Sequence, residues 1–169
     1  MRVVLIGPQS TGKSELARRL SEHLDVPWCG EYAREYALAN PRELTADDVE
    51  AIARGQMANE DAAEAALAIL DTDLISTVVY ARHYYGSCPE WIERAARARA
   101  ADLYLLLDVD TPWVDDPARD SADKREELFA KFHLALQEFE VPFHIIRGDW
   151  NERQRLAKEL IDALLRAES

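Results

Sequence analysis

The segment Gly7-Pro8-Gln9-Ser10-Thr11-Gly12-Lys13-Ser14 constrains the fold of this chain more than any other part of the sequence. It follows the apolar run Val3–Ile6 and precedes a helical stretch in which leucines recur every four residues. Glycines let the backbone turn tightly and direct its N–H groups at an anion, and the following helix points its positive end at the same place. The pattern G-x-x-x-x-G-K-S between a strand and a helix therefore predicts a phosphate-binding loop.

This loop predicts ATP and Mg²⁺ as ligands. Lys13 supplies a cation for the β- and γ-phosphates, and the Ser14 hydroxyl supplies a ligand for magnesium. We expect the nucleotide to contact the following residues: Gly7, Gln9, Ser10, Thr11, Gly12, Lys13 and Ser14.

Short apolar runs alternate with helical stretches along the rest of the chain. This alternation predicts one α/β domain over residues 1–169, with a parallel sheet covered by helices on both faces. Ligands of such sheets bind where the strands end, so functional residues are expected directly after each strand. The predicted strands are Val3–Ile6, Ala68–Leu70, Leu103–Leu107 and Phe143–Ile146, with a weaker one at Val26–Cys29. Predicted helices run from Leu16 past Leu24, from Thr45 to about Ala66, from Leu128 to Phe139 and from Leu156 to Leu165.

Composition excludes several classes of protein. The net charge of −12 argues against a nucleic-acid partner, which needs a basic surface, and suits a cationic substrate. No apolar run approaches the roughly 18 residues of a membrane span, and the opening run is too short for a signal peptide, so we expect a cytoplasmic protein. Cys29 and Cys88 lack metal-ligand spacing and are expected to be reduced.

Two predicted strands are followed by carboxylates. Glu31 is a candidate to orient and deprotonate an acceptor hydroxyl, with Arg34 one helical turn away, although a glutamate is also common at an ordinary helix start. Asp71 is a candidate magnesium ligand. Asp73 is a candidate for the base or for binding a substrate hydroxyl; the alternative is that it caps the helix starting near Leu74.

The segment after the predicted strand Leu103–Leu107 is long, polar and contains two prolines. Such segments are often lids, so Arg119 and Arg125 are candidates to neutralise phosphate charge. The alternative is a solvated charge run. Trp113 is a candidate cover for a ring-shaped substrate or a core residue. Gly148 lies in the loop expected to border adenine.

Four segments together resemble the ribosylnicotinamide kinase domain, known in bacteria as the C-terminal half of a bifunctional NAD-biosynthesis protein. The likeness covers nearly the whole chain in the same order and with similar spacing. The segments are Gly7-x-x-x-x-Gly12-Lys13-Ser14, Glu31-Tyr32-x-Arg34-x-Tyr36, Asp71-Thr72-Asp73 and Thr111-Pro112-Trp113-Val114-x-Asp116-x-x-Arg119.

The resemblance implies the P-loop kinase fold, a five-stranded parallel sheet with helices on both faces and a lid from Trp113 to Arg125. It also implies transfer of the γ-phosphate of ATP to the 5′-hydroxyl of nicotinamide riboside, giving nicotinamide mononucleotide in NAD salvage. Catalytic roles are expected for Lys13, Glu31, Asp73, Arg119 and Arg125. Substrate contacts are expected from Trp28, Glu31, Tyr32, Arg34, Asp73 and Trp113.

The sequence departs from this family at one position. Bifunctional members place a tryptophan directly before the Glu-Tyr pair, where this chain has Gly30, and its nearest tryptophan is Trp28. A cation–π contact to the pyridinium ring would then come from Trp28 or Tyr32. Two other functions stay open: a P-loop kinase of another nucleoside or small alcohol, and an ATP-dependent regulatory switch. The switch is disfavoured because it does not need carboxylates on the acceptor side.

Overall fold

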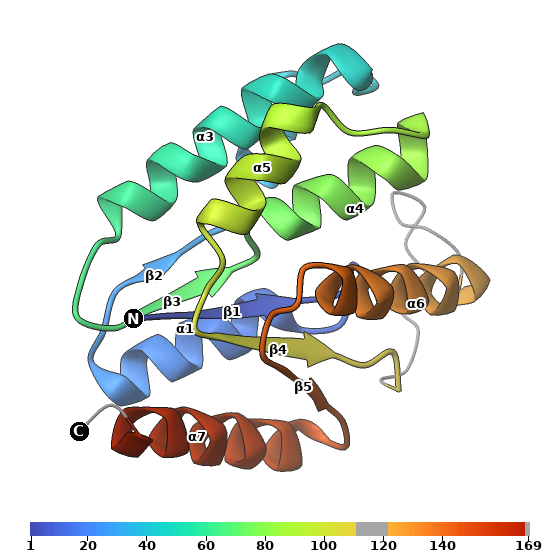
Figure 1. The fold of residues 1–169 in the computed structure, drawn as a ribbon. Helices are drawn as coiled ribbons and strands as arrows, with labels where there is room; N and C mark the ends of the chain where they lie inside the picture. The colour runs from blue at the N-terminus through green and yellow to red at the C-terminus, as the bar shows by residue number, and fades with distance from the viewer. Residues whose placement is uncertain (111–121, 168–169) are drawn as a thin grey trace.

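The apolar runs of the sequence form one parallel five-stranded sheet in the computed structural model, which describes residues 1–110 and 122–167 (Figure 1). The strand order is β2-β3-β1-β4-β5, and every neighbouring pair is parallel. The strand that leads into the phosphate-binding loop therefore lies in the centre of the sheet. The strands are β1 (Arg2–Ile6), β2 (Trp28–Cys29), β3 (Ala68–Asp71), β4 (Leu103–Leu107) and β5 (Phe143–Ile146).

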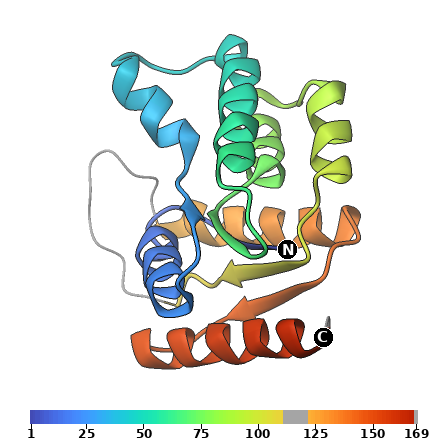
Figure 2. The same ribbon diagram turned by 90° about the vertical axis from the view of Figure 1, so that its left-hand side faces the viewer.

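Helices cover both faces of the sheet, as predicted. α1 and α7 pack on one face, and α3, α4, α5 and α6 lie on the other (Figures 1 and 2). The helices are α1 (Lys13–Leu24), α2 (Tyr32–Ala39), α3 (Val49–Ala62), α4 (Leu74–Tyr85), α5 (Glu90–Ala98), α6 (Ala122–Glu138) and α7 (Trp150–Ala167), and the short 3₁₀ helix η1 (Ala46–Asp48) precedes α3.

The central strand shows why the core has two layers. Val3 and Leu5 of β1 point into the cluster shared with α1 and α7, whereas Val4 and Ile6 point into the cluster on the opposite face. All four side chains are fully buried. Because side chains alternate along a strand, a continuous apolar run buries both faces, which is typical of the centre of a parallel sheet.

The helix predicted from Thr45 to about Ala66 begins as expected but ends early. Thr45 and Asp48 form a capping box at η1, which continues into α3. The helix ends at Ala62, so the predicted end is wrong. Ala68 pairs with Arg2 in the sheet, and the amino terminus donates a hydrogen bond to the carbonyl of Ala66. Pairing with β1 thus overrides the helix propensity of this alanine-rich stretch.

Among residues 1–110 and 122–167, no helix combines the length and apolarity needed to cross a bilayer.

Candidate active site

Two glycines of the phosphate-binding loop lie where a side chain would be both strained and crowded. Gly7 has a φ of +139°, and a Cβ there would stand 2.9 Å from the carbonyl oxygen of Leu107 in β4. Gly12 has a φ of +88°, and a Cβ there would stand 3.2 Å from the ring of Trp150. The loop therefore lies directly against the end of β4 and the start of α7, and its backbone shape depends on both glycines.

Lys13 is held inside this loop. Its ammonium donates a hydrogen bond of 2.7 Å to the carbonyl of Pro8, which also accepts one of 2.9 Å from the hydroxyl of Thr11. Burial lowers the pKa of Lys13, while the negative charges of Glu31 and Asp71 favour its protonated form. A phosphate entering the loop would meet a cation that is already positioned and poorly hydrated.

Ser14 and Asp71 form the second part of the site. The Ser14 hydroxyl donates a 2.5 Å hydrogen bond to Oδ2 of Asp71, which is 2% exposed. Oδ1 of Asp71 is buried and has no hydrogen-bond partner in the described part of the chain. A hydroxyl and a carboxylate with an unused buried oxygen are ligands that Mg²⁺ prefers, so the residues present fit this ion.

Glu31 directly precedes α2, and its side chain makes no capping hydrogen bond there. Burial raises the pKa of Glu31, and Asp71 raises it further, whereas Lys13 and Arg34 favour the charged form. Arg34 therefore lies near enough to Glu31 to affect its pKa. A partly buried carboxylate with a raised pKa beside the phosphate-binding lysine is suited to accept a proton.

Asp73 has a different environment, which supports its alternative role as a helix cap. Oδ1 accepts a 3.0 Å hydrogen bond from the backbone N–H of Ile75 and so caps α4, while Oδ2 accepts one of 2.6 Å from the hydroxyl of Tyr104. Burial raises the pKa of Asp73 to about 7. Because both oxygens have partners inside the protein, this geometry argues against the predicted roles of Asp73 as base and substrate ligand.

Trp28 and Tyr32, the aromatic residues predicted to contact the substrate, lie in and directly after the edge strand β2. Trp28 is 40% exposed at the sheet edge, and a Cβ on Gly30 would lie 3.9 Å from its ring. The Tyr32 ring packs on α3, where a Cβ at Gly55 would lie 1.9 Å from it. A groove of about 340 Å³ runs along this edge. Its lining residues are Pro27, Trp28, Cys29, Gly30, Asn59, Ala62 and Ala63.

The predicted lid is only partly described by the structure. Trp113 and Arg119 lie outside the described residues. Arg125, the last residue of the predicted lid, belongs to the first turns of α6. Its guanidinium donates a 3.4 Å hydrogen bond to the carbonyl of Ser10, which places a second cation at the phosphate-binding loop.

One residue that sequence reasoning missed holds the nucleotide side together. Arg153 is fully buried, and its guanidinium donates hydrogen bonds to the carbonyls of Gly148 (3.0 Å), Thr11 (2.9 Å) and Asp108 (3.0 Å) and pairs with Asp110. The N–H of Gly148 donates to Asp110 at 2.7 Å. Gly148 is thus connected to the phosphate-binding loop through Arg153. No sequence signal marked this arginine, because it resembles the exposed charges around it in α7.

Comparison with known proteins adds a family and several relatives. A family model described as an AAA domain matches residues 2–153. The trifunctional NAD biosynthesis/regulator protein NadR of Salmonella typhimurium is 27% identical over 176 residues, which cover 96% of this chain and 42% of that protein. The chain therefore spans less than half the length of this curated relative.

Several solved structures share the fold of this chain. NadR in complex with NR is 25% identical with a TM-score of 0.79, covering 96% of this chain and 50% of that one. NadR in complex with NAD and AMP-PNP is 26% identical with a TM-score of 0.80, covering 96% and 49%. The deoxyadenosine kinase of M. mycoides has a TM-score of 0.66 at 10% identity, covering 96% and 100%. The P-loop kinase fold predicted from the sequence is confirmed.

Proposed function

Because this chain belongs to the AAA domain family and carries an acceptor-side carboxylate beside its phosphate-binding loop, we propose that it is a nicotinamide riboside kinase. It would transfer the γ-phosphate of ATP to the 5′-hydroxyl of nicotinamide riboside and yield nicotinamide mononucleotide in cytoplasmic NAD salvage. The observation that carries the proposal is the convergence of Glu31, Lys13 and Asp71, which act on one another electrostatically. The likeness to NadR bound to NR supports the choice of acceptor.

The phosphate side accounts for binding of the donor. The backbone of the loop and Lys13 would hold the β- and γ-phosphates, and AMP-PNP, an analogue of ATP, is bound in a NadR complex. Ser14 and Asp71 would hold Mg²⁺, which neutralises phosphate charge. Arg125, already at the loop, would add positive charge as the γ-phosphate is transferred.

The acceptor side would supply the base that removes the proton of the acceptor hydroxyl. Glu31 would take the proton of the 5′-hydroxyl as that oxygen forms a bond to the γ-phosphorus, while the bond from phosphorus to the β-phosphate oxygen breaks and ADP leaves. The raised pKa of Glu31 increases its affinity for this proton. The positive charges of Lys13 and Arg34 oppose this rise in pKa and favour the charged form of Glu31.

Selectivity for a cationic ring would come from charge and aromatic faces. Gly30 leaves open the space beside the Trp28 ring, so this exposed indole can offer a face to a ligand. A pyridinium over an indole, with Glu31 nearby, would gain on the order of 2 kcal/mol over a neutral base, or roughly thirtyfold in kcat/KM.

An acceptor panel tests this function. Purified protein with ATP and Mg²⁺ is given nicotinamide riboside, its neutral reduced form, cytidine, uridine or adenosine at matched salt, and ADP release is measured. We expect nicotinamide riboside to be the best acceptor, Trp28→Leu to reduce this preference and Lys13→Ala to abolish transfer. Faster phosphorylation of a neutral nucleoside would identify a kinase of another specificity, and nucleotide binding without any transfer would favour the regulatory switch.

A further inference from the structure

We propose that Gln56 is a positioning residue of the acceptor site, whose amide fixes the Glu31–Tyr32 segment relative to the Asp71–Thr72 segment. Gln56 lies on α3, is 2% exposed and is not one of the residues that line the groove. The inference rests on the proposed function, because the two segments that it joins carry the base and the magnesium ligand.

The first contact of Gln56 holds the start of α2. Its Oε1 accepts a 3.0 Å hydrogen bond from the backbone N–H of Tyr32, the first residue of that helix. N–H groups at a helix start need an acceptor outside the helix, and the preceding Glu31 side chain does not provide one. Gln56 therefore caps α2 from a neighbouring helix and leaves the Glu31 carboxylate available for chemistry.

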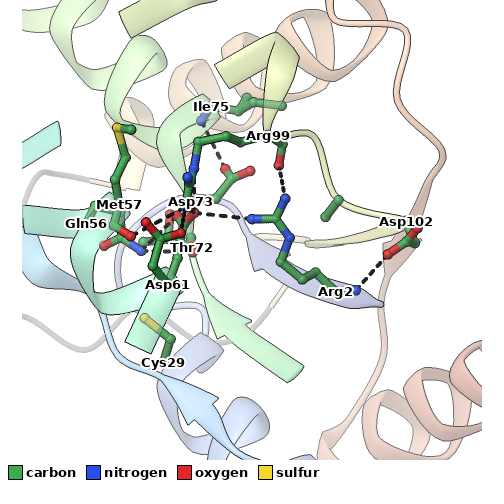
Figure 3. A network of polar contacts seen from close by, with 12 residues as sticks. Arg2, Cys29, Gln56, Met57, Asp61, Thr72, Asp73, Ile75, Arg99 and Asp102 are labelled. Atoms are coloured by element: carbon green, nitrogen blue, oxygen red, sulfur yellow. Dashed lines mark hydrogen bonds and ion pairs between the residues drawn. The ribbon is translucent and has the colours of Figure 1, made fainter. Parts of the chain in front are cut away.

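The second contact holds the end of β3. The Gln56 Nε2 donates to the carbonyl of Thr72 at 3.4 Å and to Oε1 of Glu60 at 3.3 Å. Figure 3 shows Gln56 and Thr72 in this network. Thr72 has a φ of +71°, a conformation that a β-branched residue adopts only when its surroundings impose it. Asp71, immediately before it, is thereby held next to Ser14.

The two contacts fix the orientation of the amide. Its partner at Tyr32 is a backbone donor and its partner at Thr72 is a backbone acceptor, so only an oxygen at one end and an NH₂ at the other satisfy both. A glutamate would oppose the Thr72 carbonyl and Glu60, and an apolar residue would satisfy neither group. A side-chain amide is therefore the group that this position requires.

The residue before Gln56 supports the same segment. Gly55 lies inside α3, where glycine weakens a helix by about 1 kcal/mol relative to alanine. A Cβ at Gly55 would come within 1.9 Å of the Tyr32 ring. Two consecutive residues of α3 thus receive the ring and the backbone of Tyr32. The lower helix propensity of Gly55 is therefore accompanied by close packing of Tyr32, the residue that follows Glu31.

Gln56→Met is the main test, because methionine has a similar shape but neither hydrogen-bonding group. We expect kcat/KM for the acceptor to fall by about 10- to 100-fold while KM for ATP is unchanged. The acidic limb of the pH profile of kcat/KM should move to lower pH, because a displaced Glu31 becomes more hydrated. Hydrogen exchange at the Tyr32 backbone amide should become faster.

Arg99→Gln is the matched control. Arg99 donates hydrogen bonds to Glu60, to Asp61 and to the carbonyl of Met57 at the far end of the same network. Within residues 1–110 and 122–167, its side chain makes no hydrogen bond or ion pair with either segment of the acceptor site. We expect it to lower the unfolding midpoint but to leave acceptor kinetics, the pH profile and Tyr32 exchange unchanged. If Gln56→Met behaves as Arg99→Gln does, Gln56 is only structural and the inference is wrong.

Two further arms separate this inference from the proposed function. If Gln56→Met does not fold, Gln56→Glu keeps an acceptor for Tyr32 and loses the donor to Thr72, and it should show the same loss with the acceptor and an unchanged KM for ATP. If the wild type phosphorylates another acceptor better than nicotinamide riboside, the acceptor assignment falls. The comparison of Gln56→Met with Arg99→Gln, made with that acceptor, then still decides the role of Gln56.

Discussion

The carboxylates of Glu31, Asp71 and Asp73 lie at the ends of two neighbouring strands, but their partners differ. Asp73 uses both oxygens within the protein, and Asp71 uses one and leaves the other buried without a partner. Glu31 makes no cap and lies within electrostatic reach of Lys13. These surroundings favour a base at Glu31, a metal ligand at Asp71 and a structural group at Asp73.

Glu31→Gln should therefore lower kcat, whereas Asp73→Asn should leave it nearly unchanged. Removing a general base costs about 10²- to 10⁴-fold in rate, so we expect Glu31→Gln to lower kcat within that range. Asp73→Asn keeps an oxygen for Ile75 and gains an NH₂ for the Tyr104 oxygen, and its kcat should stay close to the wild type. Steady-state kinetics with ATP and nicotinamide riboside measures both, and the reverse pattern would make Asp73 the base.

Asp71→Asn should act through magnesium. The amide keeps the shape but loses the charge, so we expect the Mg²⁺ concentration for half-maximal activity to rise roughly tenfold or more. Titration of activity with Mg²⁺ at saturating ATP measures this. Asp61→Asn, on the exposed end of α3, is the control and should leave the titration unchanged. An unaltered titration in Asp71→Asn would remove Asp71 from the metal site.

At the level of elements, the nucleotide side depends on Arg153 of α7. Its guanidinium joins the phosphate-binding loop at Thr11, the end of β4 at Asp108 and the loop before α7 at Gly148. One side chain therefore holds three loops, each of which follows a different strand. Gln56 joins the acceptor-side segments in the same way, so each half of the site has its own buried connector.

Arg153→Met should weaken both the fold and the donor site. It leaves three carbonyls without their donor, and we expect a loss of roughly 3 kcal/mol in the free energy of unfolding and a higher KM for ATP. Urea unfolding and ATP titration measure these quantities. Arg155→Met, two residues further on the exposed face of α7, is the matched control and should change little. Equal stability of the two variants would contradict this role for Arg153.

At the level of the whole molecule, buried acids link stability to pH. Burial raises the pKa values of Asp73 and Glu60 above their ordinary values. For Asp73 the folded value is about 7 against an ordinary 3.8. Between these values the folded state binds more protons than the unfolded state, so this contribution to stability is present at low pH and is lost as the pH rises.

Asp73→Asn removes this titration. We expect the free energy of unfolding of the wild type to fall relative to that of Asp73→Asn as the pH rises from 4 toward 7. The fall is at most about 1.4 kcal/mol per pH unit, which corresponds to one proton. Urea unfolding at several pH values measures the difference between the two proteins. A difference that is constant or grows in the other direction would show that Asp73 is charged in the folded protein throughout this range.

Much of the fold was predictable because its signals are local. The strands at Leu103–Leu107 and Phe143–Ile146 were predicted with their observed bounds, because short apolar runs between helical patterns are typical of buried strands. The end of α3 was not, because pairing of Ala68 with Arg2 decides it across 66 residues of sequence. The sequence left two roles open for Asp73, because only the folded chain brings the hydroxyl of Tyr104 to the carboxylate oxygen that does not cap α4.

The sequence by itself determined the phosphate-binding loop, the parallel sheet and the edge at which functional residues gather. These features depend on residue type, on short spacings and on the parallel direction of consecutive strands. All three follow from the order of residues along the chain. Only the tertiary structure decided which carboxylates have partners, that Arg125 belongs to a helix at the loop, and that Gln56 and Arg153 connect the segments of the site. Such roles arise from hydrogen bonds between residues far apart in sequence and from burial, and neither leaves a periodic or local pattern to read.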